Sequence, residues 1–215
     1  MAGRWPAFDA GVERVVFFTD AVFAIAITLL ALDIRLPAGA HLDSERGTWH
    51  AIREVAPTIL AYLLSFVIIG TFWASHLRKF RSLASYDRAF LRLDLLLLAA
   101  VAFLPFPTSV IAASGTAAAT ILYAGTIVVV ALASALSWWY AAYRAPLLDP
   151  RPADAERTLE LVQPLVVAAV FGASMLVALL SPGAARLVWL LLLVVTVGPG
   201  SRWRWRRAGR TARDR

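Results

Sequence analysis

Long apolar runs, separated by short polar or Gly/Pro-containing breaks, dominate the pattern of hydrophobic and polar positions along this chain. A helix needs about 20 mostly apolar residues to cross a hydrocarbon core of about 30 Å. Six runs approach or exceed that length, and the last is the shortest: residues 13–36, 51–76, 89–112, 117–142, 159–180 and 184–199. The pattern predicts an all-α polytopic membrane protein, with six transmembrane helices in a domain over residues 1–200 and a basic tail over residues 201–215.

The composition supports membrane insertion and argues against several kinds of site. Hydrophobic residues make up 60% of the 215 positions, the mean hydropathy is +0.70 and cysteine is absent, which excludes disulfides and thiolate metal sites. The histidines, His41, His50 and His76, are dispersed, without a second ligand at metal spacing. No nucleophile-and-base grouping or phosphate-binding loop is evident. We therefore expect no enzyme activity and no bound metal or cofactor.

Positive charge is concentrated in a few connections and at the carboxyl end. The formal net charge is +7, and seven arginines fall between Arg202 and Arg215, so the excess belongs to the tail and does not indicate a nucleic-acid-binding surface. The connection after the second run is also assigned an excess of basic residues over Asp87: Arg78, Lys79, Arg81 and Arg88. Because cytoplasmic segments of membrane proteins hold the Lys/Arg excess, both termini are predicted to be cytoplasmic, in a multi-pass protein of the cell membrane.

The first apolar run has two unlike sides when it is projected as a helix. One stripe collects Arg14, Phe18, Val22, Ile25, Leu29 and Leu32, and Asp20 falls nearly opposite to it. Periodicity alone makes such a stripe typical of packing against a neighbouring helix or lipid. A carboxylate inside the membrane is costly and normally has both a partner and a use. Asp20 is therefore expected to face the helix bundle.

The end of the second run offers partners for that carboxylate. Trp73 and His76 lie about one helical turn apart, and an indole N–H and an imidazole are suitable donors in a medium of low dielectric constant. The predicted orientation places them on the same cytoplasmic side as Asp20. Two interpretations stay open: a structural network that locks the helices together, or a gating or proton-sensing network, because histidine titrates near neutral pH.

These residues carry a resemblance to a known family. Arg14, Phe18, Thr19 and Asp20 resemble the Arg-x-x-x-Phe-Ser-Asp signature of the bacterial branch of the lysosomal/endosomal potassium channel family, with Thr19 in place of serine. The similarity continues through residues 24–30, the Trp73/His76 pair and residues 104–108, so it covers about half of the chain, from residue 13 to residue 108.

The resemblance implies a homotetramer in which the first helices line a central pore for potassium and other monovalent cations, without a carbonyl filter. It assigns a hydrophobic constriction to Ile25, Leu29 and Leu32, the positions five, nine and twelve residues after Asp20. Neighbouring pore positions are Phe18, Val22 and Thr28. It also implies a network that braces the first helix, formed by Arg14, Phe18, Thr19, Asp20, Trp73, His76 and Asp94. Relatives often carry asparagine where Asp94 stands.

Potassium is cheaper to dehydrate than sodium, so an apolar constriction gives modest selectivity for potassium. Residues 196–200 resemble a carbonyl filter only superficially, because Pro199 and two glycines here form an ordinary helix stop. One alternative is a proton-coupled transporter in which Asp20, His76 and Asp94 relay protons. Another is a structural membrane protein without conductance.

Overall fold

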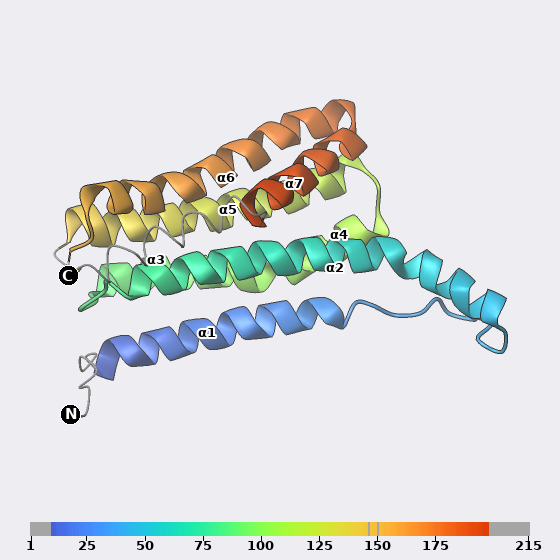
Figure 1. The fold of residues 1–215 in the computed structure, drawn as a ribbon, viewed down its shortest axis with the longest axis horizontal. Helices are drawn as coiled ribbons and strands as arrows, with labels where there is room; N and C mark the ends of the chain where they lie inside the picture. The colour runs from blue at the N-terminus through green and yellow to red at the C-terminus, as the bar shows by residue number, and fades with distance from the viewer. Residues whose placement is uncertain (1–9, 146, 150, 198–215) are drawn as a thin grey trace, which may run out of the picture.

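The computed structural model describes residues 10–197 except 146 and 150, and side chains up to residue 189. The described part is a bundle of roughly aligned helices that lie lengthwise beside one another (Figure 1). The elements are α1 (Ala10–Ala31), α2 (Glu45–Phe80), α3 (Arg88–Phe103), α4 (Pro105–Ala113), α5 (Ala117–Trp139), the π-helical turn η1 (Tyr140–Arg144), α6 (Asp154–Leu180) and α7 (Pro182–Val197). Within these residues, five spans are long and apolar enough to cross a membrane.

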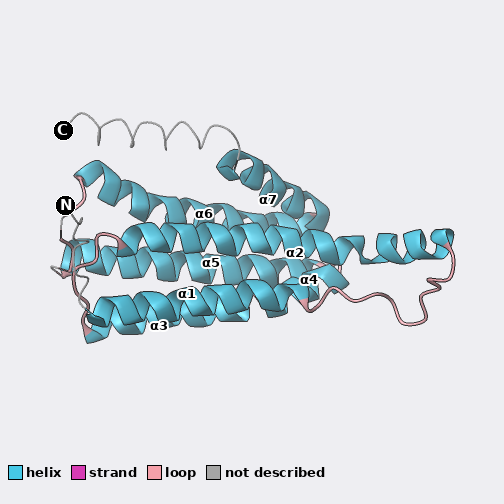
Figure 2. Ribbon diagram, turned by 60° about the horizontal axis from the view of Figure 1, so that its bottom comes forward, coloured by secondary structure: helices cyan, strands magenta, loops and turns pink. Residues whose placement is uncertain are grey.

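The second helix is longer than its apolar run, because polar residues extend it at the amino end. Ser44 accepts a hydrogen bond from the Gly47 N–H and caps α2, which therefore begins at Glu45 and not near residue 51. Its 36 residues span roughly 54 Å at 1.5 Å per residue, well beyond a hydrocarbon core of about 30 Å. Figure 2 shows the amino-terminal part of α2 extending past the other helices.

The predicted third span is divided by a break. Leu104 separates α3 from α4, and its N–H bonds to the Val101 carbonyl at 3.1 Å in a tightened last turn. Pro105 and Pro107 follow at once, and a proline inside a helix removes a backbone donor and crowds the preceding turn. The two helices nevertheless form one span, Arg88–Ala113.

Other boundaries also differ from the predicted ranges. Helix α1 ends at Ala31, so Leu32 lies in the turn that follows, and α6 begins at Asp154, five residues before the expected position 159. Helix α7 has 16 residues and includes Thr196 and Val197, so the start of the filter-like segment is helical. The end of the sixth predicted run and the basic tail, residues 198–215, lie outside the described residues.

Helix α5 occupies the centre of the bundle and α1 its edge. In the most apolar part of each span, 61% of α5 residues are buried, compared with 22% in α1. The main core packs Phe23 of α1, Ile69 of α2 and Leu97 of α3 with Ile127 of α5, and each of these side chains is at most 1% exposed. Figure 1 shows α1 on the side of the bundle away from α6 and α7. Burial of these side chains drives the packing.

Two connections at one end of the bundle pair with each other. Leu83 and Leu148 form an antiparallel bridge. The Ala84 N–H donates to the Leu147 carbonyl at 2.9 Å, and the Asp149 N–H donates to the Ser82 carbonyl at 3.1 Å. This pairing fixes the α2–α3 connection against the segment between η1 and α6.

Candidate functional site

Helix α1 presents one face to its own bundle and leaves the other uncovered. The buried face repeats every three or four residues and contains Val12, Val15, Thr19, Phe23, Ala26 and Leu30, each at most 9% exposed. The predicted constriction residues lie on the uncovered side, with Ile25 57%, Leu29 42% and Leu32 63% exposed. Phe18 and Thr28 are exposed too, whereas Val22 is partly buried against the core.

The carboxylate of Asp20 is held by the second helix. The Trp73 Nε1–H donates a hydrogen bond of 2.8 Å to Asp20 Oδ1. Asp20 is half-buried, and Trp73 is 39% exposed, so this contact lies near the surface of the subunit. The structure thus brings together one of the two expected pairs, from residues 53 positions apart in the chain.

The other expected partner of Asp20 lies elsewhere. His76 Nε2 lies 3.2 Å from Asp94 Oδ1, and the Thr19 hydroxyl donates to Asp94 Oδ2 at 3.3 Å. Thr19 and Asp94 are each 1% exposed and His76 is 5% exposed. The imidazole packs against Phe80 with ring centroids 4.5 Å apart. This contact chain, Thr19–Asp94–His76, joins α1, α3 and α2, so the expectation that His76 serves Asp20 is wrong.

Arg14 stands apart from these contacts. Its side chain is exposed, and within the described residues it makes no hydrogen bond or ion pair. It lines a hollow of about 280 Å³ between α1 and α3, together with Phe18, Tyr86 and Asp94. The structure therefore places Arg14 beside the buried chain without bonding it to that chain.

Sequence reasoning missed a buried charge network on α2. Arg78 Nε donates to Glu160 Oε1 at 2.7 Å, and Ser75 donates to the second Glu160 oxygen at 3.1 Å. Lys79, 6% exposed, donates to the Ser134 carbonyl at 3.2 Å and to its hydroxyl at 2.9 Å. Arg78 and Lys79 belong to α2, so assigning them to a connection was wrong. The overlooked signal was Glu160, the one acidic residue in the run 159–180.

Outside the membrane spans, hydrogen bonds lower the pKa of one further carboxylate, that of Asp87. Asp87 caps α3, and its pKa is lowered chiefly by the Phe90 N–H and then by the Tyr140 hydroxyl. The corresponding donor–acceptor distances are 2.7 Å and 2.6 Å. Asp87 therefore ties the start of α3 to the first residue of η1, directly after α5 and next to the paired connections.

Comparison with known proteins points to one family. The family model described as endosomal/lysosomal potassium channel TMEM175 matches residues 14–105. A protein named as a potassium channel in Streptomyces collinus is 43% identical over 145 residues, which is 64% of this chain and 68% of that one. A vertebrate protein of Gallus gallus, named as an endosomal/lysosomal proton channel, is 27% identical over 64% of this chain and 27% of its own length.

A solved structure agrees with the fold along most of its length. The crystal structure of a potassium-selective lysosomal channel homologue from Chamaesiphon minutus superimposes with a TM-score of 0.77. The superposition covers 88% of this chain and 97% of that one, at 28% sequence identity. The similarity therefore extends through the second half of the chain, beyond the residues that the family model matches.

Proposed function

The chain belongs to the endosomal/lysosomal potassium channel family TMEM175, and from that membership we propose that it is a passive, potassium-preferring cation channel. Four copies place their α1 helices around a central pore. The observation that carries the proposal is the uncovered face of α1. From Phe17 to Leu32 its large exposed side chains are apolar, and it lies away from the face that holds Thr19 and the other buried contacts.

The constriction is assigned to Ile25, Leu29 and Leu32. Ile25 and Leu29 lie roughly 6 Å apart along the helix axis at 1.5 Å per residue, Leu32 follows in the turn after α1, and all three are exposed in the single subunit. In a ring of four copies, such side chains form a narrow apolar passage. An apolar constriction obstructs ions by dewetting and by the cost of removing their hydration, and potassium is cheaper to dehydrate than sodium. Moderate selectivity follows without a carbonyl filter.

The polar contacts on the opposite face hold α1 in position. Asp20 binds Trp73 of α2, and Thr19 binds Asp94 of α3, so α1 is fixed to two different helices within about one turn. Hydrogen bonds to a charged group contribute about 1.5–3 kcal/mol. They orient the bulky side chains toward the pore, and in this role the carboxylates do not contact the permeating ion. Phe18 and Arg14, exposed beside Asp94, lie nearer to the cytoplasmic mouth.

Orientation follows from the charges at one end of the bundle. Arg81 and Arg88 flank the paired connections, at the end where α1 begins and α5 finishes. Under the positive-inside rule that end is cytoplasmic, in a multi-pass protein of the cell membrane with both termini inside.

A cysteine-accessibility experiment tests the pore assignment, because the native chain contains no cysteine. In liposomes, Leu32→Cys is expected to lose potassium flux after treatment with a cationic thiol reagent. Leu176→Cys is the matched control, because Leu176 of α6 is 70% exposed on another helix. Potassium-over-sodium reversal potentials of the unmodified protein test the selectivity. Flux that persists in treated Leu32→Cys would overturn the pore assignment.

A second candidate function is proton-coupled transport, with Asp20, His76 and Asp94 as a proton relay. The observation that favours it is the burial of His76 and Asp94 inside the spans, since buried ionisable groups often mark proton pathways. Flux assays separate the two functions. A channel dissipates a potassium gradient without a proton gradient, whereas a coupled transporter requires both.

A further inference from the structure

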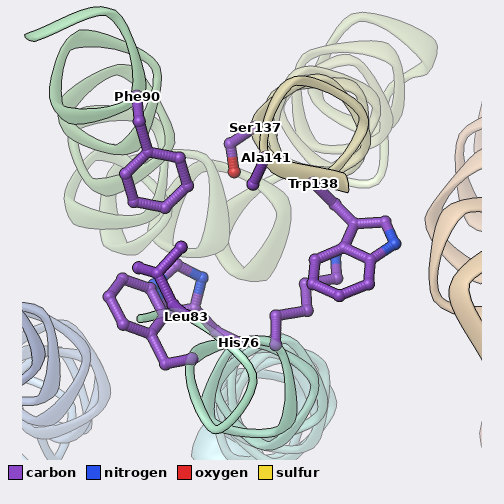
Figure 3. Close-up of a pocket in the computed structure, with 8 residues that line it drawn as sticks. His76, Leu83, Phe90, Ser137, Trp138 and Ala141 are labelled. Carbon is purple, nitrogen blue, oxygen red and sulfur yellow. The ribbon is translucent and has the colours of Figure 1, made fainter. Parts of the chain in front are cut away.

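A small cavity lies between α2, α3 and α5, beside the buried Thr19–Asp94–His76 chain. It is lined by His76, Lys79, Phe80, Leu83, Phe90, Ser137, Trp138 and Ala141. Most of this lining is apolar, and Figure 3 shows Phe90 and Leu83 closing two sides of the space. Leu83 belongs to the bridge with Leu148, so the paired connections cover the cavity at the end of the bundle.

One polar group that faces this space, the Ser137 hydroxyl, has no protein partner among the described residues. Figure 3 shows the Ser137 hydroxyl and a ring nitrogen of His76 directed into the cavity. Ser137 is 3% exposed, and its hydroxyl makes no hydrogen bond within the described residues. By contrast, Thr120 and Thr126 on the same helix bond to the carbonyl four residues earlier. Buried polar groups are normally satisfied, so Ser137 calls for a partner.

The size of the cavity indicates that the partner of Ser137 is a single water molecule. The volume open to the centre of a water-sized sphere is about 10 Å³, close to the roughly 10–15 Å³ that one water molecule needs. Three polar residues on the lining meet the further requirement of two to four polar neighbours. We propose that this cavity is a binding site for one ordered water molecule, bonded to Ser137, to His76 and to the third ammonium hydrogen of Lys79.

The proposed water connects two hydrogen-bonded networks, one containing His76 and the other Lys79, that no direct side-chain contact joins among the described residues. On one side, His76 faces Asp94, which accepts from Thr19 of α1. On the other side, Lys79 holds the Ser134 hydroxyl and carbonyl of α5. A water between them makes a continuous polar connection from α1 through α3 and α2 to α5. Helix α1 is thereby linked to the central helix of the bundle at the level of Thr19.

An isosteric pair of substitutions tests the proposal in the full-length protein in nanodiscs. Ala141→Val and Ala141→Thr add nearly the same volume to the cavity, but only threonine supplies a hydroxyl that can replace the displaced water. We expect the thermal midpoint of Ala141→Thr to exceed that of Ala141→Val by about 2–4 °C. The same substitutions at Ala142, which does not line the cavity, correct for the effect of each side chain on the helix.

Two results would overturn the water site. One is a corrected midpoint for Ala141→Val that equals or exceeds that of Ala141→Thr, because apolar atoms then fill a dry cavity as well as a hydroxyl does. The other is a density map that resolves ordered water elsewhere in the protein but has no peak within hydrogen-bonding distance of Ser137. A peak there that disappears in Ala141→Thr would support it.

Discussion

The Trp73 Nε1–H donates a hydrogen bond of 2.8 Å to Asp20 Oδ1, across 53 positions of sequence. The two residues come from α2 and α1, and both side chains are only partly covered in the single subunit. Partial burial of a carboxylate costs free energy unless a hydrogen-bond donor replaces the water that it loses. The pair therefore ties α1 to α2 at a position away from Ile25 and Leu29, and we propose that it helps to set the direction in which those side chains point.

Removing the indole donor is expected to weaken the seating of α1. Trp73→Phe keeps an aromatic ring and deletes the N–H, leaving Asp20 without its partner. The expected loss is about 1–2 kcal/mol in the free energy of unfolding, at the lower end for a charged hydrogen bond because Trp73 is 39% exposed. Asp20→Asn should lower the yield of the proposed tetramer. Thermal unfolding and size-exclusion chromatography measure the two effects.

Trp49→Phe serves as the matched control for that substitution. Trp49 lies in the part of α2 that extends past the bundle, and it is 62% exposed. Its replacement should leave stability within about 0.5 kcal/mol. A fully stable, correctly assembled Asp20→Asn protein would show that the carboxylate does not brace α1.

The ion pair between Arg78 and Glu160 should behave as a buried pair. Removing one partner should then destabilise the fold more than replacing both partners with apolar residues. The side chains of Arg78 and Glu160 are 30% and 11% exposed, and Glu160 also accepts from Ser75. Glu160→Leu is expected to cost about 2–4 kcal/mol, because it leaves the guanidinium partly buried without a carboxylate. The double variant Arg78→Met/Glu160→Leu should recover part of that loss.

Denaturation of the unmodified protein, of Glu160→Leu and of the double variant measures how far the effects of the two substitutions depend on each other. The pair Arg157–Asp154 provides the comparison, because its carboxylate partner is 92% exposed. Asp154→Asn should change stability by no more than about 0.5 kcal/mol. A double variant less stable than Glu160→Leu alone would mean that the other bonds of Arg78, to the Ala74 carbonyl at 3.2 Å and to the Gln163 amide oxygen at 3.4 Å, outweigh the cost of the lone guanidinium.

Acid should destabilise the protein through Asp87. Its folded-state pKa is lowered by the Phe90 N–H and the Tyr140 hydroxyl, so its stabilising contribution is present above the unfolded-state pKa of about 3.9. That contribution is lost as pH falls from about 4 through the lower folded-state value. Midpoints measured between pH 6 and pH 3 should fall less steeply in Asp87→Asn. Asp43→Asn, in the α1–α2 connection, should retain the unmodified slope.

The pattern of apolar positions predicted much of the fold, because helix periodicity is a local property. It identified most of the uncovered stripe of α1, although Val22 is partly buried against the core. The donor chemistry at the end of α2 identified Trp73 as a partner of Asp20. The sequence pattern could not assign His76 to Asp94, because nothing local specifies how α3 is rotated relative to α2. Arg78 and Lys79 were misplaced for a different reason, because charged residues at the end of an apolar run are typical of a connection. Here α6 supplies a carboxylate for Arg78, and Ser134 of α5 accepts from Lys79.

Boundaries were the least predictable part for a similar reason. The apolar run marks where hydrocarbon begins, but a helix continues into water when a cap satisfies its first N–H groups, as Ser44 does for α2. The sequence of residues 104–107 shows where the third span is interrupted, but the turn geometry at Leu104 depends on packing against α1 and α2.

Polar substitution at Leu29 is expected to open the proposed constriction. Leu29→Ser removes an apolar side chain that is 42% exposed in the single subunit and replaces it with a group that holds water in the passage. Single-channel conductance should rise, and the reversal potential under potassium and sodium gradients should shift toward equal permeability. Leu176→Ser, on an exposed face of α6, should leave both quantities unchanged. Because Ile25 and Leu32 could still obstruct the pore, each is to be replaced separately. Unchanged permeation in all three variants would mean that this face of α1 contacts lipid or another subunit, and that ions cross elsewhere.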